Sequence, residues 1–359
     1  MLLLPGSAWA DPLRVAFWNV GLDRRGPGLL LGAIESGEDD QVRATVEVIA
    51  RVTPDILVLA AFDYDHDLRA LSALAGALAE AGASYPHRFA LRPNTGMATA
   101  LDLDGDGRMG GPGDAQGFGY FAGQGGLAIL SRLPIVADQA RDFSAFLWHD
   151  LPGALLPETT DGSPFPSPQA LAVQRLSSTA HWAVPVQLPG GARLALLTWY
   201  GSPPVFDGPE DRNGRRGHDE AAFWAALLDG RLPFAPPDAP FVLLGGANLD
   251  PHDGDGRNAA IRALLARPDL QDPAPASPGG AVATGGVNAT QNGPAEQDTA
   301  DWPDAPGNPG NLRVDYVLPS RDLTVRASGV FWPAPGTPLA DTVVAASRHR
   351  LVWVDIDLP

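Results

Sequence analysis

Short apolar runs and amphipathic runs alternate along the chain, a pattern typical of α/β proteins. Residues 13–18 and 55–60 are apolar runs that indicate buried strands. Between them, apolar residues recur at helical spacing after two aspartates and predict a helix over residues 40–52. The same reasoning predicts helices at 67–82, 219–229 and 257–266, and strands at 126–130, 193–198, 241–244, 313–318, 324–330 and 351–356.

Loops rich in proline and glycine separate these elements, chiefly at residues 150–170 and 272–311. Strands continue to the end of the chain and no repeat of 20–50 residues occurs, so we expect one domain over residues 11–359. Residues 1–10 end in Ala8-Trp9-Ala10, a pattern of the kind that signal peptidase cuts. They predict a truncated signal peptide and a secreted or periplasmic bacterial protein; a frayed apolar start is the alternative.

The composition narrows the function. Lys and Arg total 25 against 42 Asp and Glu, a formal net charge of −17, and every one of these cations is an arginine. Proteins that coat nucleic acid neutralise many phosphates with basic side chains, so we do not expect a long nucleic-acid partner. Cysteine is absent, which excludes disulfides and thiolate chemistry. Outside residues 1–10, no stretch of the sequence approaches the ~20 consecutive apolar residues that a membrane-spanning helix needs.

Six short motifs follow one another in order at the ends of predicted strands. They are Phe17-Trp18-Asn19 and residues 57–65 (LVLAAFDYD), 126–132 (GLAILSR), 243–251 (LLGGANLDP), 313–318 (RVDYVL) and 347–352 (SRHRLV). Together they resemble the endonuclease/exonuclease/phosphatase superfamily, which includes DNase I, apurinic endonucleases and sphingomyelinases, and within it a bacterial, usually exported branch. The resemblance implies a DNase I-like four-layer sandwich of the α/β (α+β) class, with two mixed β-sheets flanked by helices.

The resemblance also implies site residues. Asn19 matches the family's metal-binding asparagine, and Asn248 matches the asparagine that orients the phosphate. His349 matches the histidine that stabilises the transition state, and Tyr200 stands at a position where the family has His or Tyr. Asp315 matches the aspartate of the Arg-x-Asp-Tyr motif and is expected to orient a histidine or support the site.

Two carboxylates that the family's chemistry needs are replaced. The metal-binding glutamate position is Ala61, and the general-base aspartate position is Gly246. A methyl group offers no oxygen to a hard cation, and glycine offers no proton acceptor. Asp63 is a candidate substitute ligand because residues two apart on a strand share a face. The family's Asp-His pair is Arg348-His349 here, a change that is usual in this branch.

Two further features outside these motifs are candidates for binding. A loop before the helix at 219–229 carries arginines suited to phosphate recognition, although nearby acidic residues offer local ion pairs instead. These arginines are Arg212, Arg215 and Arg216. A second segment matches the opening of a Ca²⁺ loop, with a solvated turn as the alternative. Its candidate ligands are Asp102, Asp104 and Asp106.

Two functions follow from the sequence. The first is a phosphoester hydrolase of reduced activity that depends on Mg²⁺ or Mn²⁺, with Ca²⁺ as a further candidate at residues 102–106. The second is a catalytically inactive relative that binds a ligand or a partner protein. In both, the scarcity of cations favours a small phosphoester or phosphate-bearing ligand over long nucleic acid. The sequence does not indicate the oligomeric state.

Overall fold

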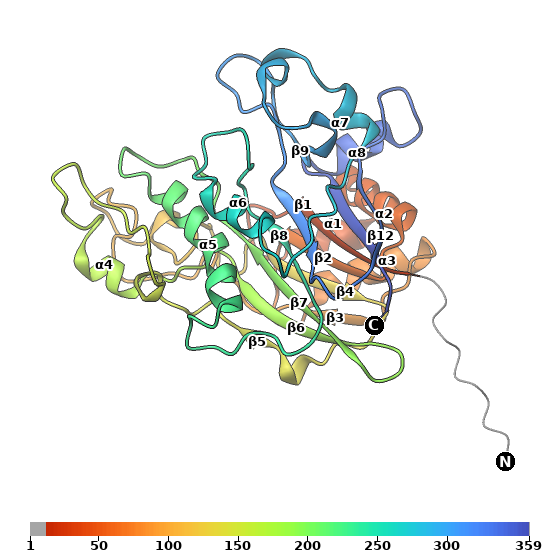
Figure 1. Ribbon diagram of the computed structural model, residues 1–359, viewed down its shortest axis with the longest axis horizontal. Coiled ribbons are helices and arrows are strands. Elements are labelled where there is room, and N and C mark those ends of the chain that lie inside the picture. Colours follow the sequence, from red (N-terminus) through yellow and green to blue (C-terminus); the bar gives the residue numbers. More distant parts are fainter. Residues whose placement is uncertain (1–11, 359) are drawn as a thin grey trace.

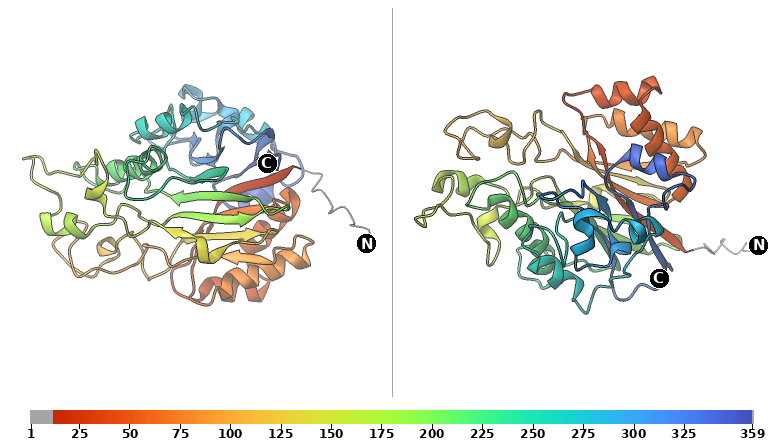
Figure 2. Two further views of the ribbon diagram at one scale, coloured as in Figure 1. Left: turned by 60° about the horizontal axis from the view of Figure 1, so that its bottom comes forward. Right: turned by 90° about the horizontal axis from the view of Figure 1, so that it is seen from above.

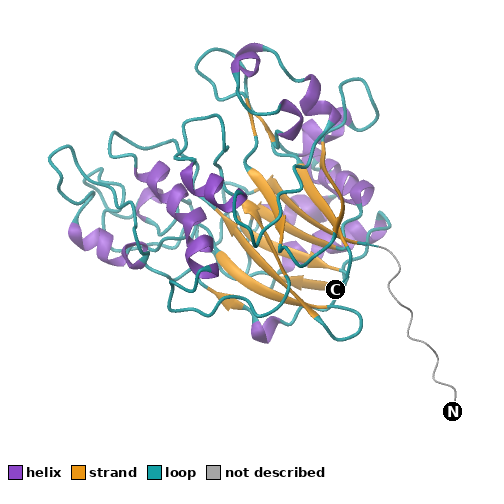
Figure 3. Cartoon of the chain, in the orientation of Figure 1, coloured by secondary structure: helices purple, strands orange, loops and turns teal. Residues whose placement is uncertain are grey.

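The computed structural model describes residues 12–358 (Figure 1). The predicted signal peptide at residues 1–10 lies outside them. In the described part of the chain, no helix has the length and apolar character needed to cross a membrane. Strands occupy the centre of the molecule and helices lie around them (Figure 3).

Two sheets form the centre. The first has six strands in the order β12-β13-β1-β2-β4-β3, with β1 parallel to β2 and the other pairs antiparallel. The second has five strands in the order β11-β8-β7-β6-β5, with β7 parallel to β8. The bounds in the first sheet are β1 (Leu13–Leu22), β2 (Ile56–Phe62), β3 (His87–Phe89), β4 (Gly126–Ser131), β12 (Val325–Phe331) and β13 (Leu351–Ile356). Those in the second are β5 (Arg141–Asp142), β6 (His181–Gln187), β7 (Arg193–Tyr200), β8 (Phe241–Gly246) and β11 (Asp315–Pro319).

Helices cover the outer face of each sheet, as the view from above shows (Figure 2). The first sheet is covered by α1 (Leu29–Ser36), α2 (Asp40–Val52), α3 (Arg69–Glu80) and α8 (Ala340–Ala346). The second is covered by α5 (Arg212–Leu228) and α6 (Ala259–Leu265). Shorter elements lie in the loops: α4 (Pro168–Val173), α7 (Pro278–Val282), the β9 (Ala300–Asp301) and β10 (Asn311–Leu312) pair, and 3-10 turns at Pro112–Asp114, Ala137–Gln139, Trp148–Asp150, Gly286–Thr290 and Ala295–Gln297. The two mixed sheets and their flanking helices confirm the predicted fold class.

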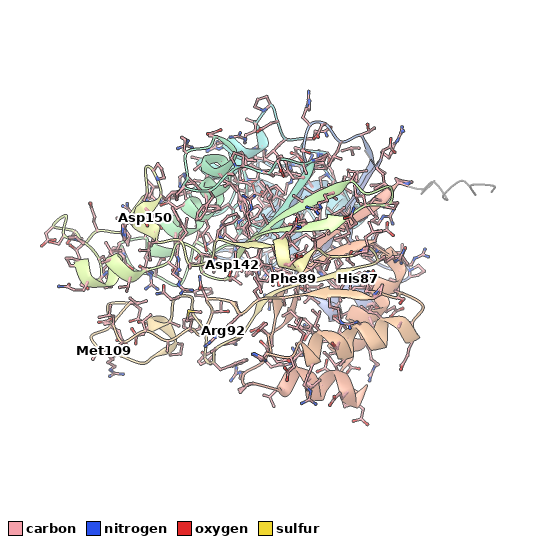
Figure 4. All side chains as sticks on the ribbon, turned by 90° about the horizontal axis from the view of Figure 1, so that it is seen from below. His87, Phe89, Arg92, Met109, Asp142 and Asp150 are labelled. Atoms are coloured by element: carbon pink, nitrogen blue, oxygen red, sulfur yellow. The ribbon has the colours of Figure 1, made fainter. Side chains whose placement is uncertain are left out.

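Side-chain alternation along the strands produces the layers. On β1, Val15 and Phe17 pack between the two sheets, whereas Ala16 and Trp18 pack beneath the helices. Burial of each large apolar side chain stabilises the fold by roughly 1.5–3 kcal/mol, so this alternation fixes which face of the strand is inner. The outer strands meet too: the ring of Phe89 on β3 lies edge-on to Trp182 on β6, with 5.5 Å between centroids. Figure 4 shows Phe89 on β3 near Asp142 at the end of β5.

The structure corrects several element boundaries. Helix α5 begins at Arg212, not Asp219, so part of the predicted arginine loop forms its first turns. Gly214 and Gly217 obscured this start; a Cβ at Gly217 would lie 2.7 Å from the Ser202 carbonyl oxygen, so close packing requires glycine there. Strand β6 and helix α1 were not predicted, and the predicted loop at 272–311 contains α7, β9 and β10.

Candidate active site

Polar side chains gather near the ends of β1, β7 and β8 and at the start of β11, between the two sheets. Asn19, near the end of β1, is buried, and its Nδ2 donates to the Tyr200 hydroxyl at 2.8 Å. Its Oδ1 accepts from the Gly21 backbone N–H at 3.2 Å. Burial raises the pKa of Tyr200 to about 12, so this phenol is neutral at physiological pH and keeps a proton to donate.

A buried Asp–His pair stands beside these residues. His349 Nδ1 lies 2.7 Å from Asp315 Oδ2, and Asp315 is fully buried. Because the carboxylate accepts, Nδ1 carries the proton in this arrangement and Nε2 is the nitrogen free to meet a ligand. The Trp18 indole donates to the His349 carbonyl oxygen at 3.0 Å, which ties the histidine segment to β1. The predicted support of a histidine by Asp315 is therefore present in the geometry.

Asn248 completes the cluster from the end of β8. It is buried with φ of 52°, and its Nδ2 donates to the Gly201 carbonyl oxygen at 2.7 Å. A side chain in the left-handed region is uncommon outside glycine and is often found at functional sites. We call the set of Asn19, Tyr200, Asn248, Asp315 and His349 the five-residue cluster.

Gly246 faces the centre of this cluster. In the sheet, Gly246 pairs with Tyr200 on one side and with Asp315 on the other. A Cβ built there would lie 2.8 Å from Cδ2 and Cε2 of the Tyr200 ring and 3.1 Å from Asp315 Oδ1. The tyrosine ring thus takes the space into which an aspartate at this position would project.

Ala61 lies at an irregular point of β2. Its φ is 52°, and the pairing of β2 shifts register on both sides, against β1 and against β4. Bulges of this kind often redirect a side chain next to an active site. Ala61 is half-buried and does not belong to the buried hydrophobic core.

Asp63 is committed to backbone contacts. It is buried, and its two oxygens accept from the backbone N–H groups of Arg24 and Gly125, each at 2.9 Å. Burial raises its pKa to about 6. These contacts hold two loops together.

The residues at the family's metal-binding positions leave few oxygens for a divalent cation, although Asp315 Oδ1 in the five-residue cluster is buried without a hydrogen-bond partner. Such an ion needs several oxygen ligands. Ala61 supplies none, Asn19 Oδ1 accepts from a backbone N–H, and the oxygens of Asp63 are engaged. Within residues 12–358, the one group of three acidic or histidine ligand atoms that lie close together is elsewhere, at Asp102, Asp104 and Asp106.

That aspartate loop has its oxygens within 4.8 Å of one another. Both oxygens of Asp102 accept backbone N–H groups, from Gly105 at 2.6 Å and Gly107 at 2.8 Å. Burial raises the pKa of Asp104, with Asp106 and Asp114 adding to the shift. The loop therefore concentrates negative charge, as a Ca²⁺ site would, while its geometry also suits a hydrogen-bonded turn.

The three arginines assigned to phosphate binding lie elsewhere. Arg216 is buried and donates to the backbone carbonyl oxygens of Gln116, Arg175, Leu176 and Ser177. Arg215 donates to the Leu156 carbonyl oxygen at 3.2 Å, and Arg212 to that of Leu103, beside the aspartate loop. The burial of Arg216 contradicts its assignment to phosphate. Arg212 and Arg215 also brace loops against α5, and their assignment to phosphate stays a prediction.

Two contributions to the site were not found from the sequence. Thr299 Oγ1 accepts from the backbone N–H groups of Val314 and Asp315, at 2.9 and 3.0 Å. The Trp302 ring stands edge-on to His349, with 5.3 Å between centroids. Both residues belong to the proline- and glycine-rich segment 272–311, whose composition hid its role.

Two stacked mixed sheets with a polar cluster at their strand ends define the DNase I-like class of fold. The model of the Endonuclease/Exonuclease/phosphatase family matches residues 16–349, and the chain belongs to this family. Two similar solved structures are an endonuclease/exonuclease/phosphatase from Beutenbergia cavernae and a family protein from Leptotrichia buccalis. The first is 19% identical with a TM-score of 0.53, over 97% of this chain and 72% of that one. The second is 15% identical with a TM-score of 0.51, over 96% of this chain and 100% of that one. No curated protein matches the chain.

Proposed function

We propose that the chain binds a small phosphate-bearing ligand at the five-residue cluster and hydrolyses phosphoesters slowly or not at all. The observation that carries this proposal is the double replacement at Ala61 and Gly246, together with the Tyr200 ring beside Gly246. Loss of general-base help costs roughly 10²–10⁴-fold in rate. Loss of a metal ligand weakens a further several kcal/mol of charge stabilisation, and the two losses are not additive.

The remaining groups suit phosphate binding. The Tyr200 hydroxyl donates a proton, and the Asn248 amide lies buried next to it. His349 presents Nε2, because its Nδ1 is bonded to Asp315, and Nε2 donates to a phosphate oxygen when the imidazole carries both protons. Hydrogen-bond donors in a buried site interact strongly with an anion.

A slow hydrolase dependent on Mg²⁺ or Mn²⁺ is the second candidate. The short contact between His349 and Asp315 favours it, because a histidine held by a carboxylate can still stabilise developing charge. Measurable turnover of a phosphoester would distinguish this slow hydrolase from a protein that only binds phosphate.

One experiment separates these outcomes. Binding of inorganic phosphate is measured by calorimetry, and turnover of p-nitrophenyl phosphate and bis-p-nitrophenyl phosphate is measured with Mg²⁺, Mn²⁺ or Ca²⁺ and with EDTA. We expect phosphate binding that His349→Ala weakens about tenfold, and that the matched exposed variant Arg321→Ala leaves unchanged. Turnover that depends on metal and vanishes in His349→Ala would establish the slow hydrolase. Absence of phosphate binding would refute the proposal.

Three accessory proposals accompany the site. The Ala8-Trp9-Ala10 pattern supports export to the periplasm or the exterior. The clustered oxygens of Asp102, Asp104 and Asp106 support Ca²⁺ binding outside the active site. The net charge of −17 supports a small ligand rather than long nucleic acid.

A further inference from the structure

An open depression of about 520 Å³ adjoins the five-residue cluster. One wall comes from the segment that contains Asp301, Trp302 and Asp304, and the other from the end of α8 and Arg348. These two segments lie side by side at the top of Figure 1, where α7, β9 and α8 meet. The volume is in the range of small-molecule sites.

The depression shares a wall with His349. Ala300 forms a β-bridge with His349, and the Asp301 N–H donates to the Arg348 carbonyl oxygen at 2.9 Å. The Trp302 ring contacts His349 on one side and also lines the depression. A ligand with its phosphate at His349 Nε2 therefore has room beside Trp302 for the group that the phosphate carries.

The charges of the walls nearly cancel. Asp301 Oδ2 pairs with Arg350 Nη2 at 2.8 Å, so its charge is neutralised within the wall. Asp304 and Arg348 are both exposed and have opposite charges. The exposed charges of the walls are therefore one of each sign, and the depression has no net excess of charge to attract an ionic group.

The walls carry both acceptors and donors, since Thr284, Asn288 and Asn311 also line the depression. Asp301 and Asp304 present carboxylates, while Arg348 is the cationic donor among the lining residues. Trp302 supplies a half-exposed aromatic face, and Val282 and Val344 are apolar residues at 59% and 64% exposure. This mixture matches a polyol or sugar, whose hydroxyls donate to carboxylates and whose C–H face packs on an aromatic ring.

We infer that this depression receives a neutral polyhydroxylated group, and that Trp302 and Arg348 select polyol phosphates as ligands. This inference rests on the proposed phosphate site at His349. It also gives a role to Arg348, which replaces the family's aspartate: Asp315 supports His349 instead, and the arginine side chain turns to the depression.

The test compares dissociation constants measured by calorimetry. The ligands are inorganic phosphate, three polyol phosphates (glycerol 3-phosphate, ribose 5-phosphate and glucose 6-phosphate), phosphocholine as a cationic rival and phenyl phosphate as an aromatic rival. We expect at least one polyol phosphate to bind about tenfold more tightly than inorganic phosphate, and more tightly than either rival.

Variants assign the preference to the pocket. Trp302→Leu and Arg348→Ala should each reduce the ratio of the polyol phosphate's affinity to that of inorganic phosphate about 3- to 10-fold. Trp302→Phe should restore part of it, and the exposed control Arg321→Ala should have no effect. Because Arg348 is exposed, its variant tests the pocket even if Trp302→Leu disturbs folding.

Two failures are distinguishable. If inorganic phosphate binds in a manner sensitive to His349→Ala but no polyol phosphate binds better, the pocket inference is wrong and the proposed function stands. A rival that equals the best polyol phosphate, or full preference in Arg348→Ala, also overturns the inference. If neither phosphate nor any phosphate ester binds, the proposed function and the inference fall together.

Discussion

Ala61 and Gly246 are both positions where the family's chemistry needs a carboxylate, yet their surroundings differ. Ala61 is half-buried at a bulge of β2, and its backbone keeps φ of 52° although alanine gains nothing from that conformation. Gly246 lies inside the second sheet, where a Cβ would lie 2.8 Å from two atoms of the Tyr200 ring. At Ala61 the carboxylate is missing from a half-buried position. At Gly246 the Tyr200 ring occupies the space that a carboxylate would need.

This difference determines how easily a carboxylate could be restored at each position. A non-glycine residue with positive φ costs of order 1–3 kcal/mol, and it persists only where surrounding structure enforces it. The positive φ at Ala61 is therefore enforced by the surrounding structure and not by a preference of alanine for that conformation. At Gly246, the Tyr200 ring packs so close to the backbone that a side chain would clash with it. Restoring chemistry at Ala61 is a local change, whereas restoring it at Gly246 requires repacking.

The largest expected effect is that of Gly246→Asp. The new side chain must displace the Tyr200 ring and would place a second carboxylate beside Asp315 Oδ1. Overpacking and like charge together should lower the free energy of unfolding by about 3 kcal/mol, measured by urea denaturation. Ala61→Glu should change it by less than about 0.5 kcal/mol, because a half-buried site tolerates substitution.

Matched controls keep this comparison sharp. Gly246→Ala tests sterics without charge and should still destabilise the fold by about 1 kcal/mol. Gly76→Ala, in helix α3 with nothing within 4 Å of the new Cβ, should be neutral or stabilising. If Gly246→Asp is as stable as Ala61→Glu, the Tyr200 ring does not lock this position and the comparison fails.

The second prediction concerns the segment that backs Asp315. Burial raises the pKa of Asp298 to about 7, and the carboxylates of Asp250, Asp253 and Glu296 raise it further. The folded protein thus holds a proton that the unfolded chain releases from about pH 4. Because the folded state binds more protons in that window, this group lowers stability as pH rises from about 4 to 7. The loss is complete above the folded pKa.

Asp298→Asn should remove this dependence. The variant should be more stable than the parent by about 2 kcal/mol at pH 8, after allowance for solvent screening, and about equal to it at pH 4. Asp255→Asn removes a charge from an exposed loop nearby and should give no such difference. Thermal unfolding across pH 4–8 measures both. An equal gain at both pH values would show that charge burial at Asp298 is not the cause.

The fold was largely predictable because its strands are continuous apolar runs and its motifs stand at strand ends. Helix α5 shows the limit: Gly214 and Gly217 read as loop residues, and only the approach of the Ser202 carbonyl explains why glycine lies in that helix. Tertiary packing overrode local propensity there. Strand β6 was not predicted because Pro185 interrupts its pattern.

The candidate site was predictable in part for a related reason. The five residues lie in or next to strands, and the topology brings these strand ends together. Arginine content was misleading, because a guanidinium suits a phosphate and a set of carbonyl oxygens equally well, and Arg216 is buried among carbonyls. Trp302 gave no signal, since its contact with His349 joins residues 47 positions apart through a loop of low complexity.

The smallest expected effect concerns the other place where the chain gathers oxygens. The family's metal-binding position holds Ala61, which offers no cation ligand. By contrast, Asp102, Asp104 and Asp106 have carboxylate oxygens within 4.8 Å of one another. If Ca²⁺ binds there as weakly as in extracellular modules, 1 mM Ca²⁺ should stabilise the fold by about 1 kcal/mol. The rise in Tm should disappear in Asp106→Asn, which removes one ligand charge and keeps the side chain's size. Asp161→Asn, in another exposed turn, should retain it.

Equal Ca²⁺ responses in both variants would identify the aspartate loop as a hydrogen-bonded turn. The chain would then have no carboxylate-rich cation site among residues 12–358, and the contrast with Ala61 would disappear.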